Sequence, residues 1–168
     1  MNRRSKAASA MNDIQGGFSL IELLAAAAII GLLATVAVPV IETTMRRERE
    51  HQLRQALRDI RQAIDAYKRT ADSGRIEVKT GESGYPRELG DLAAGIADKE
   101  NPGGPRLYFL RRVPRDPFAA DAKVSAIDSW GKRSFQSPPD APMEGEDVFD
   151  VYSTSSQVGL NGVAYAKW

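Results

Sequence analysis

Residues 16–24 of the chain read GGFSLIELL, and residues 18–41 form one apolar run in which Glu22 is the single ionisable side chain. As a helix rising 1.5 Å per residue, this run would be roughly 36 Å long, which is enough to cross the hydrocarbon core of a bilayer. A carboxylate in lipid is unfavourable by about 2.5 to 3.5 kcal/mol on insertion scales, so such a residue usually has a function. We therefore expect a membrane-spanning helix with a functional acid near its beginning.

The segment before the apolar run carries Arg3, Arg4 and Lys6 against one acid, Asp13. This excess of positive charge favours a cytoplasmic location for the leader. A secretory signal would place its small-residue cleavage site after the apolar run and so remove it, whereas here the candidate site precedes the run.

The residues Gly17-Phe18-Ser19-Leu20-Ile21-Glu22, followed by an apolar helix containing Pro39, resemble the N-terminus of type IV pilins and type II secretion pseudopilins. The resemblance implies that a membrane-embedded peptidase cleaves after Gly17 and methylates the new amine of Phe18. Residues 1–17 would then be a cleaved leader, counted from Met1 or from a second start at Met11.

After cleavage, the ammonium of Phe18 and the carboxylate of Glu22 can pair within one subunit or between neighbouring subunits of a filament. Either pairing neutralises two charges that are costly in lipid, so we assign Glu22 to filament assembly. The alternative is a Glu22 that reaches the lipid headgroups. Pro39 lacks a backbone donor, so we predict that Gly31 and Pro39 bound a region where the helix kinks or loosens.

Residues 42–71 change from continuous to amphipathic helical patterning. Apolar residues recur at spacings of three and four, namely Leu53, Leu57, Ile60, Ile64 and Tyr67. Two heptads are too short for a free coiled coil, so we expect this stripe to pack on the protein's own globular domain. Gly74 is available to end the helix in a left-handed conformation.

Residues 72–168 are expected to form that domain. Their many Gly and Pro residues predict loops around a short helix at 87–94, docked by Leu89 and Leu92. Three strands are predicted, at 132–136, 148–153 and 162–167, with Trp130 as a core anchor. Together with the resemblance, this gives an α+β, type IV pilin-like fold: a long N-terminal helix on a small antiparallel sheet.

Two C-terminal features resemble major pseudopilins more closely. One is the Arg-x-Pro-x-Asp-Pro turn at residues 112–117, in which Asp116 is expected to accept hydrogen bonds from nearby amides. The other is Phe149-Asp150-Val151-Tyr152-Ser153 with a tryptophan, Trp168, close to the end.

In many such relatives the C-terminal loop binds calcium. Here residues 154–168 contain no Asp or Glu, and calcium prefers six to eight oxygens including carboxylates. Asp147, Asp150, Ser155 and Asn161 are the remaining oxygen donors. We therefore expect no cofactor and no metal site.

Catalysis has little support, because the chain has one histidine, His51, no cysteine and no phosphate-binding glycine loop. The formal net charge of +1 does not favour nucleic acid as a partner. Many type IV pilins close their C-terminal region with a disulfide, so the absence of cysteine favours a pseudopilin.

The resemblance implies a structural subunit of a type II secretion pseudopilus, which supports export of folded proteins across the outer membrane. Its partners would be copies of itself, the prepilin peptidase, an inner-membrane assembly platform, minor pseudopilins and lipid. We expect a single-pass inner-membrane protein with a cytoplasmic N-terminus and a periplasmic domain. Two alternatives stay open: a type IV pilus pilin for adhesion, motility or DNA uptake, and a non-polymerising membrane anchor with a periplasmic binding domain.

Overall fold

The computed structural model of the chain describes residues 17–168, and for residues 36–39 it describes the backbone alone. The expected leader and the alternative start at Met11 lie almost wholly outside the described residues. The chain divides into two compact units, Met1–Thr43 and Thr44–Trp168. The described elements are helix α1 (Leu20–Asp72), helix α2 (Asp91–Ala94), strands β1 (Trp130–Arg133) and β2 (Asp150–Ser153), and the 3-10 helix η1 (Tyr165–Lys167).

Helix α1 begins and ends at residues that suit helix ends. The carbonyl of Ser19 accepts the first bonds, from the amides of Glu22 (3.0 Å) and Leu23 (3.1 Å), and serine is favoured at such a position. After Asp72, Gly74 adopts a φ of 84° and its amide donates to the carbonyl of Ala71 (2.9 Å). A glycine adopts this left-handed conformation without a steric penalty, so the predicted end of the helix is confirmed.

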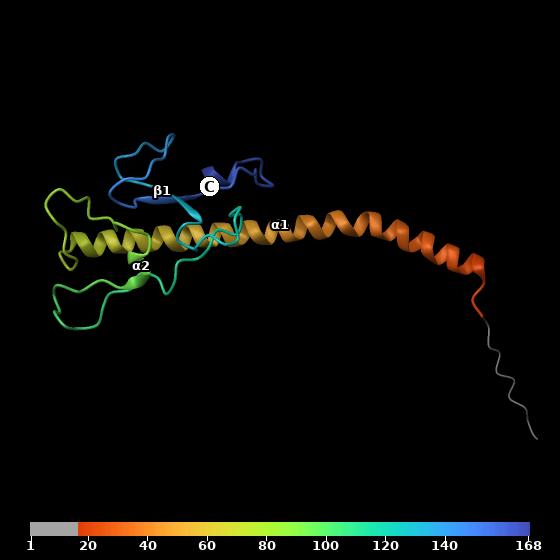
Figure 1. Cartoon of the computed structure of the whole chain (residues 1–168), viewed down its shortest axis with the longest axis horizontal. Helices are drawn as coiled ribbons and strands as arrows, with labels where there is room; N and C mark the ends of the chain where they lie inside the picture. Colours follow the sequence, from red (N-terminus) through yellow and green to blue (C-terminus); the bar gives the residue numbers. More distant parts are fainter. Residues whose placement is uncertain (1–16) are drawn as a thin grey trace, which may run out of the picture. The chain divides into compact units, whose positions relative to one another are not determined.

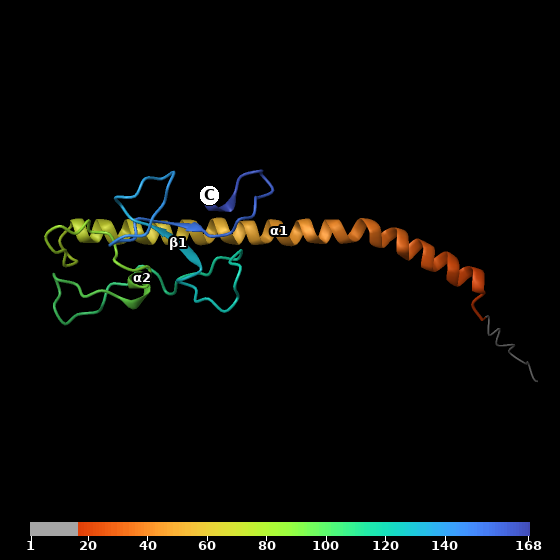
Figure 2. The same ribbon diagram turned by 45° about the horizontal axis from the view of Figure 1, so that its top comes forward.

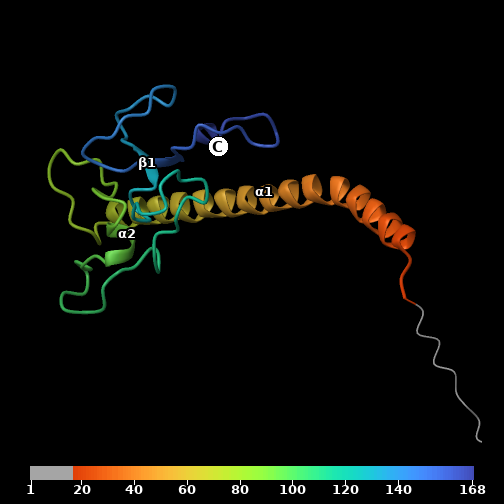
Figure 3. The same cartoon turned by 45° about the vertical axis from the view of Figure 1, so that its right-hand side comes forward.

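The second half of α1 forms the base of the hydrophobic core. All five residues of the predicted stripe, Leu53, Leu57, Ile60, Ile64 and Tyr67, are buried. Figure 1 shows the rest of the second unit arranged around this half of α1, with α2 on one side and β1 on another, and the turned views agree (Figure 2, Figure 3). The amphipathic pattern therefore predicted correctly that the helix packs on its own domain.

Helix α2 is shorter than the sequence suggested. It covers Asp91–Ala94 instead of 87–94, because an irregular turn at residues 86–90 precedes it. Leu89 and Leu92 are fully buried as predicted. The carbonyl of Leu92 also accepts hydrogen bonds from the amides of Phe109 (3.0 Å) and Leu110 (2.9 Å). These two bonds hold the end of the loop that follows α2.

The sheet has two antiparallel strands, with Trp130 opposite Ser153 and Arg133 opposite Asp150. Both strands fall at predicted positions, although β1 begins two residues earlier than expected. The third predicted strand, at 162–167, is wrong: after the turn at Gly162 (φ 80°), residues 165–167 form η1. The amide of Lys167 donates to the carbonyl of Ala164 (2.9 Å), so the backbone bonds locally and only Val158 and Ala164 form a bridge.

The turn at residues 112–117 connects the loop region to the sheet. The buried carboxylate of Asp116 accepts the amide of Phe118 (2.8 Å) and the hydroxyl of Ser153 on β2 (2.6 Å). Trp130 is buried, and its indole nitrogen donates to the carbonyl of Pro114 (2.8 Å). The predicted roles of Asp116 and Trp130 are thus both confirmed.

Candidate assembly site

The N-terminal end of α1 carries the predicted processing and assembly residues. Gly17 and Phe18 lie in the short non-helical segment before the helix, and Glu22 lies in its first turn. The positive end of the helix dipole stabilises an acid at this position. The side chain of Phe18 is 76% exposed, so the predicted cleavage position is accessible in the structure.

The first half of α1 is apolar and uncovered. The structure shows many large exposed side chains there, among them Leu20, Ile21, Leu24, Ile30 and Leu33. By length and composition this helix can cross a membrane. An apolar surface of this extent on a soluble monomer marks a membrane or protein interaction site, so this half of α1 is a surface for lipid or for other helices.

The backbone of α1 is continuous through Gly31 and Pro39. A Cβ atom built at Gly31 meets no neighbouring atom within 4 Å, so no contact within the described chain requires glycine there. The roles of both residues as a kink or loosening point stay predictions.

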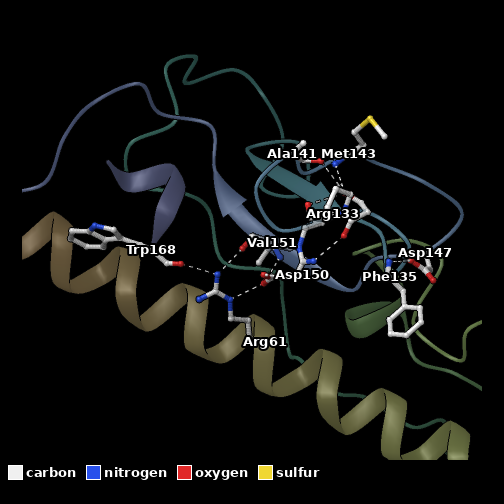
Figure 4. A network of polar contacts seen from close by, with 11 residues as sticks. Arg61, Arg133, Phe135, Ala141, Met143, Asp147, Asp150, Val151 and Trp168 are labelled. Carbon is white, nitrogen blue, oxygen red and sulfur yellow. Dashed lines mark hydrogen bonds and ion pairs between the residues drawn. The ribbon is translucent and has the colours of Figure 1, made fainter. Parts of the chain in front are cut away.

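A second group of polar residues attaches the sheet to the globular half of α1 (Figure 4). Arg61 donates from Nε to the Oδ1 atom of Asp150 (2.8 Å), and from Nη2 to the carbonyls of Val151 (3.1 Å) and Trp168 (2.9 Å). The Oδ2 atom of Asp150 also lies 3.5 Å from Nη2 of Arg133. One arginine on the helix therefore contacts both β2 and the C-terminal segment.

Glu50 and Arg46, which the sequence reading did not single out, form a third polar group. Glu50 is only 4% exposed and accepts the hydroxyl of Tyr165. Arg46 donates from Nε to the same hydroxyl oxygen (3.3 Å). The signal that reveals Glu50 is its spacing, since it lies three residues before Leu53 and continues the apolar stripe by one position.

Tyr165 is fully buried beside Glu50 and Arg46. Its ring stacks on Phe118 with centroids 4.1 Å apart and meets Trp168 edge-on at 5.0 Å. Burial raises the pKa of the Tyr165 hydroxyl above its usual value, and the neighbouring Glu50 carboxylate raises it further while Arg46 opposes this. The hydroxyl is therefore protonated at neutral pH and acts as a hydrogen-bond donor.

Comparison with known proteins places this chain among proteins with the same N-terminal feature. Residues 13–38 match the family model of the prokaryotic N-terminal methylation motif. The type II secretion system core protein G of Dickeya chrysanthemi is 27% identical over 160 residues, covering 90% of this chain and 95% of the relative. The protein of the same name from Pectobacterium carotovorum is 29% identical over 141 residues, covering 79% and 81%.

The core protein G of Klebsiella pneumoniae is 27% identical over 134 residues, covering 79% of this chain and 91% of the relative. No solved structure is a significant match. The methylation motif, the long apolar helix and the small antiparallel sheet define a type IV pilin-like protein. Within this class, the chain is similar over most of its length to the core protein G of type II secretion systems.

Proposed function

We propose that this chain is the structural subunit of a type II secretion pseudopilus, a homopolymer built by head-to-tail packing of N-terminal helices. The observation that carries the proposal is the uncovered apolar half of α1 with Glu22 in its first turn, within a matched methylation motif. Repeated head-to-tail contacts that do not close into a ring generate a fibre. The role is structural, and the globular unit serves as the part carried on the filament surface.

Processing prepares the subunit for this assembly. Cleavage after Gly17 creates an ammonium group on Phe18, and methylation leaves that group charged at neutral pH. The carboxylate of Glu22 then neutralises the amine of its own or a neighbouring subunit, so that neither charge stays unpaired in an apolar surrounding. The partners in this scheme are the prepilin peptidase, the assembly platform, minor pseudopilins and further copies of the chain.

Before assembly, the subunit resides in the inner membrane with its N-terminus in the cytoplasm and its globular unit in the periplasm. The basic residues Arg3, Arg4 and Lys6 ahead of the apolar run support this orientation. Extraction from the lipid into the filament replaces lipid contacts of the apolar helix by contacts with other helices.

Mass spectrometry of the native mature protein tests the processing step. The expected N-terminal residue is a methylated Phe18, and Gly17→Val should leave the leader attached. A functional native protein that retains its first seventeen residues would contradict the proposal.

A deletion strain tests the role in export. Loss of the gene should abolish secretion of folded proteins into the medium, and overproduction should give filaments visible by negative stain. Normal secretion with lost surface pili would instead support a type IV pilin, and the absence of any filament would support a membrane anchor.

A further inference from the structure

The C-terminal loop is held to α1 by a buried carboxylate. Glu50 Oε1 accepts the amide of Leu160 (2.7 Å) and the hydroxyl of Tyr165 (3.0 Å). The two donors lie at the two ends of the turn that contains Gly162. A single carboxylate of the helix therefore holds this loop by accepting two hydrogen bonds from it.

Two arginines flank this carboxylate at helical spacing. Arg46, one turn earlier, donates to the carbonyl of Val158 and to the hydroxyl oxygen of Tyr165. Arg54, one turn later, lies 3.7 Å from Glu50 Oε2, and its guanidinium stacks 4.3 Å from the ring centroid of Trp168. The negative charge of Glu50 is thus balanced by cationic groups of the chain itself.

Asp147 and Asp150, the acidic residues considered as oxygen donors, already have other partners. Asp147 accepts the amide of Phe135 through Oδ1 (2.8 Å). The Oδ1 atom of Asp150 accepts a hydrogen bond from Arg61 (2.8 Å), and its Oδ2 atom forms an ion pair with Arg133. A carboxylate already paired with two arginines is a poor calcium ligand, because the cation would compete with fixed positive charges.

The neutral donors are also used within the loop. Ser155 Oγ accepts the amide of Gln157 (3.3 Å), and Asn161 Oδ1 accepts the amide of Val163 (3.1 Å). Within residues 17–168, no group of three or more His, Asp or Glu side chains is placed to hold a metal ion. These residues do not fit the calcium site that the family resemblance implies.

We propose that Arg46, Glu50 and Tyr165 form a clamp that replaces calcium, so that the loop at residues 157–165 is ordered without any metal ion. The glutamate supplies the anionic acceptor, the arginine supplies the cation, and the tyrosine hydroxyl connects the two. This proposal concerns the folded subunit and does not rest on the proposed function in secretion.

Thermal unfolding of the full chain in detergent tests the metal independence. The unfolding midpoint in about 1 mM calcium chloride should lie within about 1 °C of the midpoint in excess chelator. A site with a dissociation constant of about 10 µM would be nearly saturated and would raise the midpoint by about 10 °C. A calcium-dependent increase of several degrees would overturn the proposal.

Hydrogen exchange followed by mass spectrometry tests the clamp itself. Glu50→Ala removes the acceptor of two donors, so exchange in residues 157–165 should become at least about tenfold faster. Glu50→Gln keeps an acceptor oxygen but loses the charge, and it should give a smaller increase. The matched control is Glu48→Ala, which removes an exposed glutamate whose carboxylate accepts a hydrogen bond from Gln52 on the same helix, and it should leave the loop unchanged.

The two variants keep the test decisive. Exchange at the wild-type rate in residues 157–165 of a folded Glu50→Ala protein would overturn the clamp. If Glu50→Ala does not fold, exchange is measured on Glu50→Gln instead. An unchanged exchange rate in that variant would also overturn the clamp. Both measurements are made on the monomer, so a failure of filament assembly does not affect them.

Discussion

The two halves of α1 belong to one continuous helix, but they differ in what covers their apolar side chains. In the first half Ile30 is 66% exposed, whereas in the second half Ile60 is 0% exposed. The second half alternates apolar and charged residues, and its own domain covers the apolar stripe. The first half is apolar on all faces, so the monomer leaves it to lipid or to other subunits.

The two halves of α1 therefore have separate roles, one in folding of the subunit and one in contacts outside it. Side chains of the second half stabilise the subunit, because they leave water when the chain folds. The large side chains described in the first half, such as Ile30, are mostly exposed and are available for intermolecular contacts. Substitutions in the two halves should therefore be separable by measurement.

The largest effect is expected at Glu22. Glu22→Gln keeps the size of the side chain and removes the charge, so the amine of Phe18 loses its counter-ion in the apolar filament core. Filament yield should fall more than about tenfold, in line with the cost of an unpaired charge in lipid. Quantitative electron microscopy gives the yield, and mass spectrometry should show normal processing. An unchanged yield would disprove the pairing of Phe18 and Glu22.

A matched pair of isoleucines tests the comparison directly. Ile60→Ala opens a cavity in the core and should lower the free energy of unfolding by about 2 to 5 kcal/mol. Ile30→Ala changes an exposed position and should leave the unfolding of the detergent-solubilised monomer within about 0.5 kcal/mol. Chemical denaturation with circular dichroism measures both. Equal losses would show that the two halves are not energetically distinct.

The buried turn should give a smaller loss. Asp116→Ala leaves the hydroxyl of Ser153 and the amide of Phe118 without their acceptor, at a cost of about 1 to 3 kcal/mol. Asp121→Ala serves as the control, because Asp121 is exposed and its carboxylate caps a local turn at Lys123. If both substitutions had equal effects in urea denaturation, the turn would not depend on Asp116.

The smallest effect concerns acid stability of the second unit. A hydrogen bond from Arg75 lowers the pKa of Asp98 below its ordinary value, so this pair stabilises the fold above about pH 4 and the contribution declines as the pH falls further. Asp98→Asn should flatten the pH dependence of unfolding below about pH 4. The exposed Asp140, changed to Asn, is the control. A steeper acid transition in Asp98→Asn would contradict the sign.

Sequence patterns correctly predicted which face of α1 is buried and where this helix ends. The stripe Leu53, Leu57, Ile60, Ile64 and Tyr67 is buried as its spacing required, and Gly74 ends the helix as expected. Both features depend on local periodicity and backbone conformation, which a sequence displays directly.

The C-terminal segment shows why prediction failed elsewhere. The segment at residues 162–167 is predicted to be a strand, yet Tyr165–Lys167 form η1. Its backbone conformation follows from the burial of Tyr165 against Phe118 and Glu50, residues that lie 47 and 115 positions away. Local propensity carries no information on such distant contacts.

Periodicity and composition are properties of adjacent residues, so they were sufficient to predict the apolar run with Glu22, the amphipathic continuation of the helix and the small α+β domain. Only folding shows which groups meet the buried Glu50, namely the amide of Leu160 and the hydroxyl of Tyr165, with Arg46 beside that hydroxyl. That outcome depends on which distant donors reach a carboxylate once the chain has folded, and the free energy of burying a charge is set by those partners.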